Sequence, residues 1–219
     1  MTSGKKIALI AVPVVAVAVA IAAVFALPST GDSTDVQGCD AIERRVNTIL
    51  VTLGGSTDET RNATNVLVDE YCKRTQLVEE IGAMKNPAIG LVAYGCDAGS
   101  GRLGDGGLQQ SLRPYATIYC DNAFVAIFEQ SESLLTEADD FRDYILGRLE
   151  GGQGDPEGNG SNNATSTVNL EEVEAKFQEI SALANQAKSL LRSDKYYDAA
   201  KAYDSATKLL DELASTDIG

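Results

Sequence analysis

The stretch NPAIGLVAYGCDAGSGRLGDGGLQQSLRPYATIYC, residues 86–120, contains the signals that decide the fold. Asn86 followed by Pro87 is typical of a helix start, with Asn as the cap and Pro in the first turn. The apolar run that follows predicts a short helix with one face lined by Ile89, Val92, Ala93 and Cys96. Because short apolar runs are ambiguous, a buried strand remains the alternative here.

The glycines in the second half of this stretch have the G-x-G-x-x-G spacing of a dinucleotide-binding loop, at Gly99, Gly101 and Gly104. Such a site needs its third glycine to open a sustained helix within a βαβ unit. Here two more glycines follow, and any helix from Leu108 meets Pro114 within a few residues. We therefore interpret the loop as a flexible excursion closed by a disulfide, with its glycines serving the turn.

The four cysteines predict two disulfides, because no C-x-x-C spacing occurs and a bridged chain fits an oxidising compartment. Cys96 and Cys120 would close the glycine loop, and a closed loop of about 25 residues contributes about 3 kcal/mol in the chain-entropy model. Cys39 and Cys72 lie at nearly equal distances from Gly55, where two antiparallel helices are expected to meet. Equal heights on two such helices favour a Cys39–Cys72 bridge.

Periodicity predicts helices on both sides of the opening stretch. One runs from Cys39 to Leu53, where two glycines end it, and a Ser56-x-x-Glu59 capping box opens a second that reaches about Met84. A long helix is expected to begin at Pro114 and to continue, with or without a break, through residue 145. Residues 28–149 are thus predicted to form a helical domain with two disulfides.

The N-terminus predicts a membrane anchor, because residues 7–27 contain no charge. As a helix this segment is about 31 Å long, enough to cross a bilayer core. Lys5 and Lys6 precede it and acidic residues follow, so residues 1–6 are expected in the cytoplasm and the bulk of the chain outside. The alternative is a secreted protein, released by cleavage of the segment near Ala26.

The C-terminal part of the chain differs in composition from the part before it. Residues 150–169 are rich in Gly, Asn and Ser and predict a flexible linker. Residues 170–219 then predict a helical hairpin, with its turn near Asp194.

One motif in the hairpin, about residues 183–211, resembles a single tetratricopeptide repeat. It consists of Leu183, Ala187, Leu190, Tyr196, Ala199, Tyr203 and Ala206. The resemblance implies that the small residues let two helices approach, that the aromatic rings fill the groove between them, and that the hairpin binds protein. Asp194 stands where the family has its turn glycine. Because one repeat is not stable alone, the hairpin must pack on the disulfide domain, a second copy or a partner.

Several kinds of chemistry are excluded by composition. The chain has no histidine, which removes Ser-His-Asp and Cys-His catalysis and every His-ligated metal site. Neither a nucleophile elbow nor a phosphate-binding lysine motif occurs. The net charge of −14 disfavours nucleic-acid binding. We expect no enzyme, no cofactor and no metal; a calcium site at Asp97 and Asp105 is a minor alternative, since the loop lacks the EF-hand ligand pattern.

Three N-x-S/T sequons occur, at Asn62, Asn159 and Asn163. The last two lie in the predicted linker, where a glycan would be accessible, whereas Asn62 lies within a predicted helix.

The sequence thus predicts an all-α chain with an N-terminal transmembrane helix, a disulfide-stapled helical bundle, a flexible linker and a C-terminal helical hairpin. The expected function is that of a membrane-anchored extracytoplasmic interaction or scaffold protein, an envelope component or accessory subunit. The hairpin would bind a protein partner or a second copy, and residues 7–27 the bilayer. The candidate partner-binding residues are Phe177, Leu183, Tyr196 and Tyr203. The alternative function is an extracytoplasmic small-molecule-binding or sensing domain with its ligand near Tyr94, Tyr115 and Tyr119.

Overall fold

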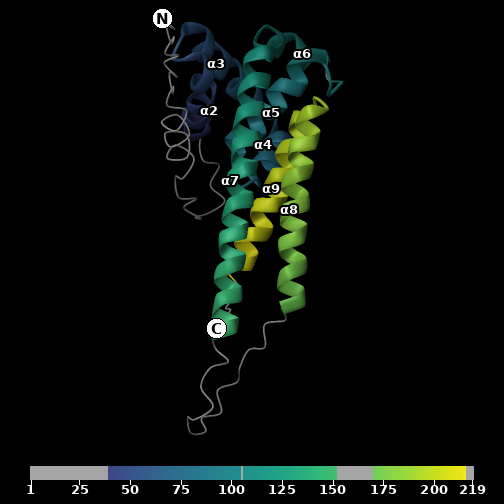
Figure 1. The fold of residues 1–219 in the computed structure, drawn as a ribbon. Helices are drawn as coiled ribbons and strands as arrows, with labels where there is room; N and C mark the ends of the chain where they lie inside the picture. The colour runs from purple at the N-terminus through teal and green to yellow at the C-terminus, as the bar shows by residue number, and fades with distance from the viewer. Residues whose placement is uncertain (1–38, 105, 152–169, 216–219) are drawn as a thin grey trace, which may run out of the picture. The chain divides into compact units, whose positions relative to one another are not determined.

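The computed structural model describes residues 39–104, 106–151 and 170–215 (Figure 1). These residues are 89% helical and contain no strand, which confirms the all-α prediction and excludes a buried strand after Asn86. The described helices lie within one compact unit, Asp35–Gly219. In chain order they are α2 (Cys39–Gly54), α3 (Asp58–Cys72), α4 (Thr75–Gly82), α5 (Pro87–Gly99), α6 (Gly106–Leu112), the 3-10 turn η1 (Arg113–Tyr115), α7 (Ala116–Gly151), α8 (Leu170–Arg192) and α9 (Tyr196–Ser215).

The core of the unit is built around α5. Asn86 caps this helix by accepting a hydrogen bond from the Ile89 amide, and Pro87 occupies the first turn, as the sequence predicts. The helix is buried on nearly every side and packs against α2, α6, α7 and α9. Its glycines permit this close packing: a Cβ on Gly95 would lie 2.8 Å from a Leu67 methyl carbon, and one on Gly99 would lie 3.0 Å from a backbone oxygen.

The long helix α7 runs beside α5. Pro114 lies in η1, one turn before α7 begins, so the predicted helix start is displaced by two residues. No break interrupts α7, which extends to Gly151 and therefore includes the first residues assigned to the linker. The rest of that linker, residues 152–169, lies outside the described residues.

The α2–α3 hairpin packs against α5, and its first helix also contacts α7. Gly55 makes the turn at a positive φ of 70°, as the double glycine predicts. The predicted capping box was wrong by one residue: Thr57 is the cap and Thr60, rather than Glu59, completes the reciprocal pair. A threonine hydroxyl at the third helical position reaches back to the cap amide as a glutamate would.

The predicted second helix to Met84 was also wrong, because α3 ends at Cys72 and α4 begins only at Thr75. Both Tyr71 and Leu77 are buried. They are six positions apart in the sequence, a spacing that places two side chains on different faces of one continuous helix. A break between α3 and α4 lets both side chains enter the core.

The C-terminal hairpin, α8 and α9, forms as predicted and packs on α5 and α7. The sequence left three possible packing surfaces for the hairpin: the disulfide domain, a second copy or a partner. The structure shows that it packs on the helices joined by the Cys96–Cys120 disulfide. Asp194 adopts a positive φ of 56° in the turn, a conformation that glycine adopts most readily. Ala187, Ala199 and Ala206 are fully buried between the helices.

The predicted membrane span 7–27, its cleavage alternative near Ala26 and the following residues up to 38 all lie outside the described residues. Among the residues that are described, no helix is long and apolar enough to cross a bilayer. The anchor stays a prediction.

Candidate hairpin docking site

The Cys96–Cys120 disulfide joins the last turn of α5 to α7, which confirms this predicted pair. The two Cα atoms are 4.7 Å apart. Cys72 is also disulfide-bonded, but the side chain of Cys39, its predicted partner, lies outside those described. The Cys39–Cys72 connectivity therefore stays a prediction.

The glycine loop after Cys96 is shorter than predicted, because Gly99 belongs to α5 and the glycines at 106 and 107 to α6. Gly101 and Gly104 have φ values of 79° and 72°, so these two glycines do serve the turn. The amides of residues 100–102 all donate hydrogen bonds back to carbonyls of α5, and the Arg102 amide reaches Asp97. The loop is thus a bonded turn that brings Arg102 beside Asp97.

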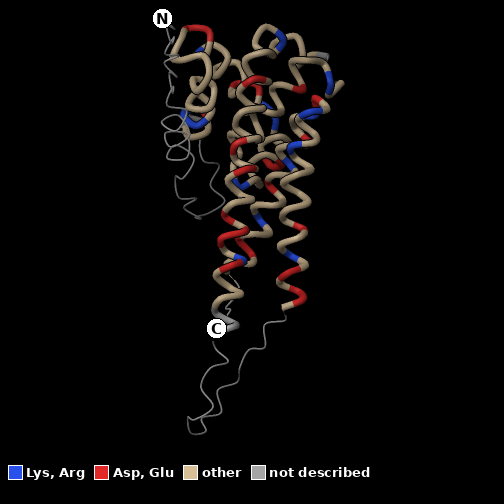
Figure 2. Tube along the Cα trace, in the orientation of Figure 1, with Lys and Arg blue, Asp and Glu red and all other residues tan. Residues whose placement is uncertain are grey.

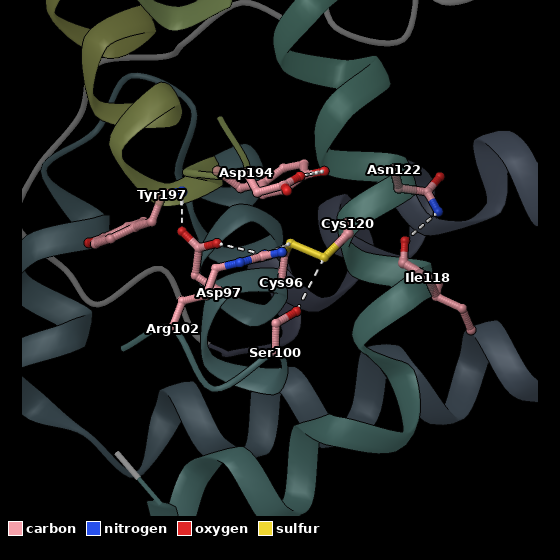
Figure 3. Close-up of a disulfide and its surroundings, with 10 residues drawn as sticks. Cys96, Asp97, Ser100, Arg102, Ile118, Cys120, Asn122, Asp194 and Tyr197 are labelled. Carbon is pink, nitrogen blue, oxygen red and sulfur yellow. Dashed lines mark hydrogen bonds and ion pairs between the residues drawn. A yellow bond between two sulfur atoms is a disulfide. The ribbon is translucent and has the colours of Figure 1, made fainter. Parts of the chain in front are cut away.

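The buried carboxylate of Asp97 is the centre of the site (Figure 3). Its side chain is only 6% exposed, and one oxygen accepts a hydrogen bond of 2.8 Å from the Tyr197 amide. Tyr197 lies in the first turn of α9, whose leading amides have no partner within the helix. Asp97 therefore caps a helix that lies 100 residues further along the chain, and its charge is favoured by the helix dipole.

Arg102 neutralises the same carboxylate. Its Nη1 lies 3.2 Å from the second oxygen of Asp97 and 3.5 Å from the Cys96 sulfur. The guanidinium also lies over the Tyr196 ring, 5.5 Å from the centroid. One side chain from the loop thus contacts the disulfide, the capping carboxylate and the first residue of α9.

A second buried carboxylate fixes the other end of α5. Asp204 of α9 is 8% exposed and accepts a hydrogen bond of 2.6 Å from the Lys85 amide, just before α5 begins. Its other oxygen pairs with Lys208 at 2.8 Å, and the Lys85 ammonium pairs with Asp211. Helix α9 is therefore bonded to both ends of the core helix.

Ion pairs also connect α8 to α7. Arg142 donates two hydrogen bonds of 2.8 Å to Glu174, and Lys188 pairs with Glu132 at 2.6 Å. Both pairs are partly exposed, so solvent screens them and their contribution to stability is small. Acidic residues gather along the halves of α7 and α8 that lie farther from the disulfide (Figure 2).

Three of the four predicted partner-binding residues lie in the interior of the unit. Phe177 is 4% exposed and meets Phe141 edge-on, and the Tyr203 hydroxyl donates to Gln130. Tyr196 is 9% exposed beneath Arg102, whereas Leu183 is half-buried. In this arrangement the aromatic residues fix the hairpin to α7 and to the loop after α5 of the same chain.

The tyrosines predicted to surround a ligand also have contacts of their own. Tyr119 is fully buried, and its hydroxyl donates a hydrogen bond of 2.7 Å to the Ala63 carbonyl. Burial, with a smaller contribution from the nearby Tyr115, raises the Tyr119 pKa well above its ordinary value. Tyr94 packs edge-on against Tyr197 with 5.4 Å between ring centroids.

Of the predicted glycosylation and calcium sites, only some lie within the residues that the structure describes. Asn62 is exposed on α3, but Thr64 of its sequon is buried and bonded within the helix. Asn159, Asn163 and Asp105 lie outside the described residues. Within the described parts, no group of three or more acidic or cysteine side chains is arranged to hold a metal ion.

The sequence reasoning missed the capping roles of Asp97 and Asp204. Each stands among small or apolar residues that the structure buries, and an acidic residue in such a run was the available signal. The identity of their partners could not be read from it, because both partners are distant backbone amides.

Comparison of the chain with protein-family models, with curated proteins and with solved structures found no match. The resemblance of the hairpin to a tetratricopeptide repeat therefore has no support from a family model.

Proposed function

We propose that this chain is a membrane-anchored, extracytoplasmic interaction or scaffold protein. Residues 7–27 would hold the disulfide-stapled helical unit at a lipid bilayer, as an envelope component or as an accessory subunit of a membrane complex. The uncharged segment and the two basic residues before it support the anchor, and the bonded cysteines support an oxidising compartment.

The observation that carries the proposal is the way in which the C-terminal hairpin is fixed to α5. Asp97 and Asp204 bond α9 to both ends of that helix, so the hairpin belongs to the same unit as the disulfide. A unit fixed in this way suits a scaffold, because it presents its outer helix faces in one arrangement. A partner or second copy would reach Phe177 and Tyr203 only if the hairpin left its place.

The outer faces of α7 and α8 are therefore the proposed contact surface. Tyr144 and Leu170 are 58% and 48% exposed, and acidic residues surround this end of both helices (Figure 2). A protein partner that meets this surface needs apolar contacts together with basic groups.

Site-specific photocrosslinking of the full-length chain in native membranes tests the proposal. A crosslinker at Tyr144 or Leu170 should give one adduct of constant mass, and a crosslinker at Leu53 of α2 should not. Leu53 is a matched control because its exposure, 53%, lies between those of Tyr144 and Leu170. If no exposed position gives a specific adduct, or if all three give the same set, the scaffold role is wrong.

The anchor has a separate test. Alkaline extraction should leave the full-length chain in the membrane pellet and release a chain lacking residues 7–27. A soluble chain whose sequence begins close to residue 27 would instead show the cleaved, secreted alternative.

The linker is proposed to be a glycosylated spacer. Enzymatic deglycosylation should lower the mass of the chain through Asn159 and Asn163, and Asn163→Gln should remove part of that change. An unchanged mass would show that neither sequon is used.

A further inference from the structure

We propose that the Cys96–Cys120 disulfide is a site of thiol–disulfide exchange with a defined polarity. A small dithiol, or the dithiol of an oxidoreductase, attacks the Cys120 sulfur, and Cys96 leaves as the thiolate. The exchange does not depend on the scaffold role, because it follows from the surroundings of the two sulfurs alone.

The two cysteines differ in their access to solvent. Cys96 is fully buried, whereas Cys120 is partly exposed. Figure 3 shows Cys120 next to Ser100. The Ser100 hydroxyl, itself exposed, lies 3.7 Å from the Cys120 sulfur. Exchange requires that the attacking thiolate reach one sulfur of the bond, so access directs the attack to Cys120.

The two sulfurs also differ in their electrostatic surroundings. Arg102 donates a hydrogen bond from Nη1 to the Cys96 sulfur at 3.5 Å, whereas the hydrogen-bonding contact of the Cys120 sulfur is with the neutral hydroxyl of Ser100. A guanidinium stabilises a thiolate, and a thiolate that is stabilised leaves faster. The charge therefore favours Cys96 as the leaving group.

Arg102 is held in this place by contacts that do not involve sulfur. Its Nη1 is also paired with Asp97 at 3.2 Å, and its guanidinium lies over the Tyr196 ring. The Asp97 carboxylate is buried next to Cys96 and would by itself disfavour a second negative charge there. Arg102 contacts both the Asp97 carboxylate and the Cys96 sulfur, and its positive charge offsets that repulsion. It is therefore the residue that stabilises the leaving thiolate.

The exchange balances in two steps. In the first, the attacking thiol loses its proton to water, a bond forms between its sulfur and Cys120, the Cys96–Cys120 bond breaks, and its electron pair passes to Cys96. In the second, the remaining thiol of the dithiol loses its proton to water and displaces Cys120. The dithiol is oxidised to a disulfide, and the protein is reduced to two cysteines that take up the protons.

The first test maps the mixed disulfide. The full-length chain in mild detergent is treated with reduced glutathione while iodoacetamide alkylates any freed thiol, and the peptides are analysed by mass spectrometry without reductant. Glutathione should be found on Cys120 and the carbamidomethyl group on Cys96. The reverse pattern, or equal amounts of both, would overturn the proposed polarity.

The second test measures how fast dithiothreitol reduces this bond in Arg102→Gln. Loss of leaving-group stabilisation should slow the reduction by about fivefold or more. A merely structural role predicts the opposite sign, because a loosened loop exposes the disulfide and speeds its reduction. An unchanged or faster rate would therefore overturn the role of Arg102.

Two further variants complete this test. Arg102→Lys keeps the charge and should recover part of the rate, and a Lys variant as slow as the Gln variant would contradict a charge effect. Arg113→Gln removes an exposed arginine from η1 and should reduce at the rate of the unchanged chain. A comparable slowing in Arg113→Gln would show that net charge, rather than the contact with Cys96, sets the rate.

Discussion

The two helical hairpins that flank the core, α2–α3 and α8–α9, are held by different means. In α2–α3, Cys72 is disulfide-bonded, a glycine makes the turn, and Tyr119 of α7 donates a hydrogen bond to the Ala63 carbonyl. The α8–α9 hairpin contains no cysteine, and a non-glycine residue makes its turn. Its attachment to the core depends on apolar burial and on two buried carboxylates, Asp97 and Asp204.

The difference shows how a hairpin without a covalent link can still be part of a compact unit. A buried carboxylate is stable only where donors or cations compensate its charge. Asp97 and Asp204 each find a backbone amide of the facing segment together with a basic side chain. They therefore specify one position for α9, while the apolar side chains of both helices supply most of the free energy of docking.

The largest effect is expected from the apolar part of the α8–α9 attachment. Ile180 of α8 is fully buried, so Ile180→Ala should lower the free energy of unfolding by about 2–5 kcal/mol. Leu183→Ala on the same helix removes a half-buried side chain and should cost less than half as much. Urea unfolding of the full-length chain in mild detergent measures both, and equal losses would contradict a hairpin docked through its Ile180 face.

The next effect tests the carboxylate anchor. Asp97→Ala leaves the Tyr197 amide and Arg102 without their buried partner and should lower the free energy of unfolding by about 2–3 kcal/mol. Asp58→Ala on α3 removes an exposed ion pair and should change it by about 0.5 kcal/mol or less. Hydrogen exchange should show faster exchange of the Tyr197 amide in the first variant only. An unchanged amide would contradict the capping role.

A smaller effect is expected at the contact between α7 and the α2–α3 hairpin. Tyr119→Phe removes a buried hydrogen bond and should cost about 1 kcal/mol at neutral pH. Because burial raises the pKa of Tyr119 above the ordinary value of 10.0, the folded chain keeps its proton where the unfolded chain loses it. The contribution of Tyr119 is therefore complete below pH 10 and falls as the pH rises further.

Alkaline unfolding of the two chains measures this dependence. The stability difference between the unchanged chain and Tyr119→Phe should close above about pH 10 and then reverse, at up to about 1.4 kcal/mol per pH unit. A difference that stays constant between pH 8 and pH 11.5 would show that Tyr119 ionises equally in both states.

The smallest effects compare the two turns. Gly55 has a positive φ and open space around it, so Gly55→Ala should lower the free energy of unfolding by about 1 kcal/mol through the backbone alone. Asp194 also has a positive φ, so Asp194→Gly should raise it by about 0.5 kcal/mol. Thermal unfolding should give shifts of opposite sign, and a loss at both turns would show that the Asp194 side chain is needed there.

Much of the local structure could be predicted from the sequence, because the signals lie in neighbouring residues. Asn86 and Pro87 start α5 as predicted, and the double glycine ends α2. The Cys96–Cys120 pair was predicted as the one that remains once Cys39 is paired with Cys72, and it encloses the glycine loop. The break between α3 and α4 was missed, because the apolar residues on both sides of it have helical spacing. Only the position of the core shows that the helix must end before Thr75.

By itself, the sequence determined an all-α chain with a stapled glycine loop and a C-terminal hairpin, because capping residues, helical periodicity and glycine act over a few positions. The tertiary structure decided where that hairpin packs and what its aromatic residues do. Asp97 is one carboxylate in an acidic chain until α9 brings an amide to it from 100 residues away. Tyr196 and Phe177 likewise lie on apolar helix faces whose partners the sequence does not name, and in the structure they are buried against Arg102 and Phe141. Such pairings depend on which helix faces meet in space. The sequence of one helix face does not indicate which distant segment packs against it.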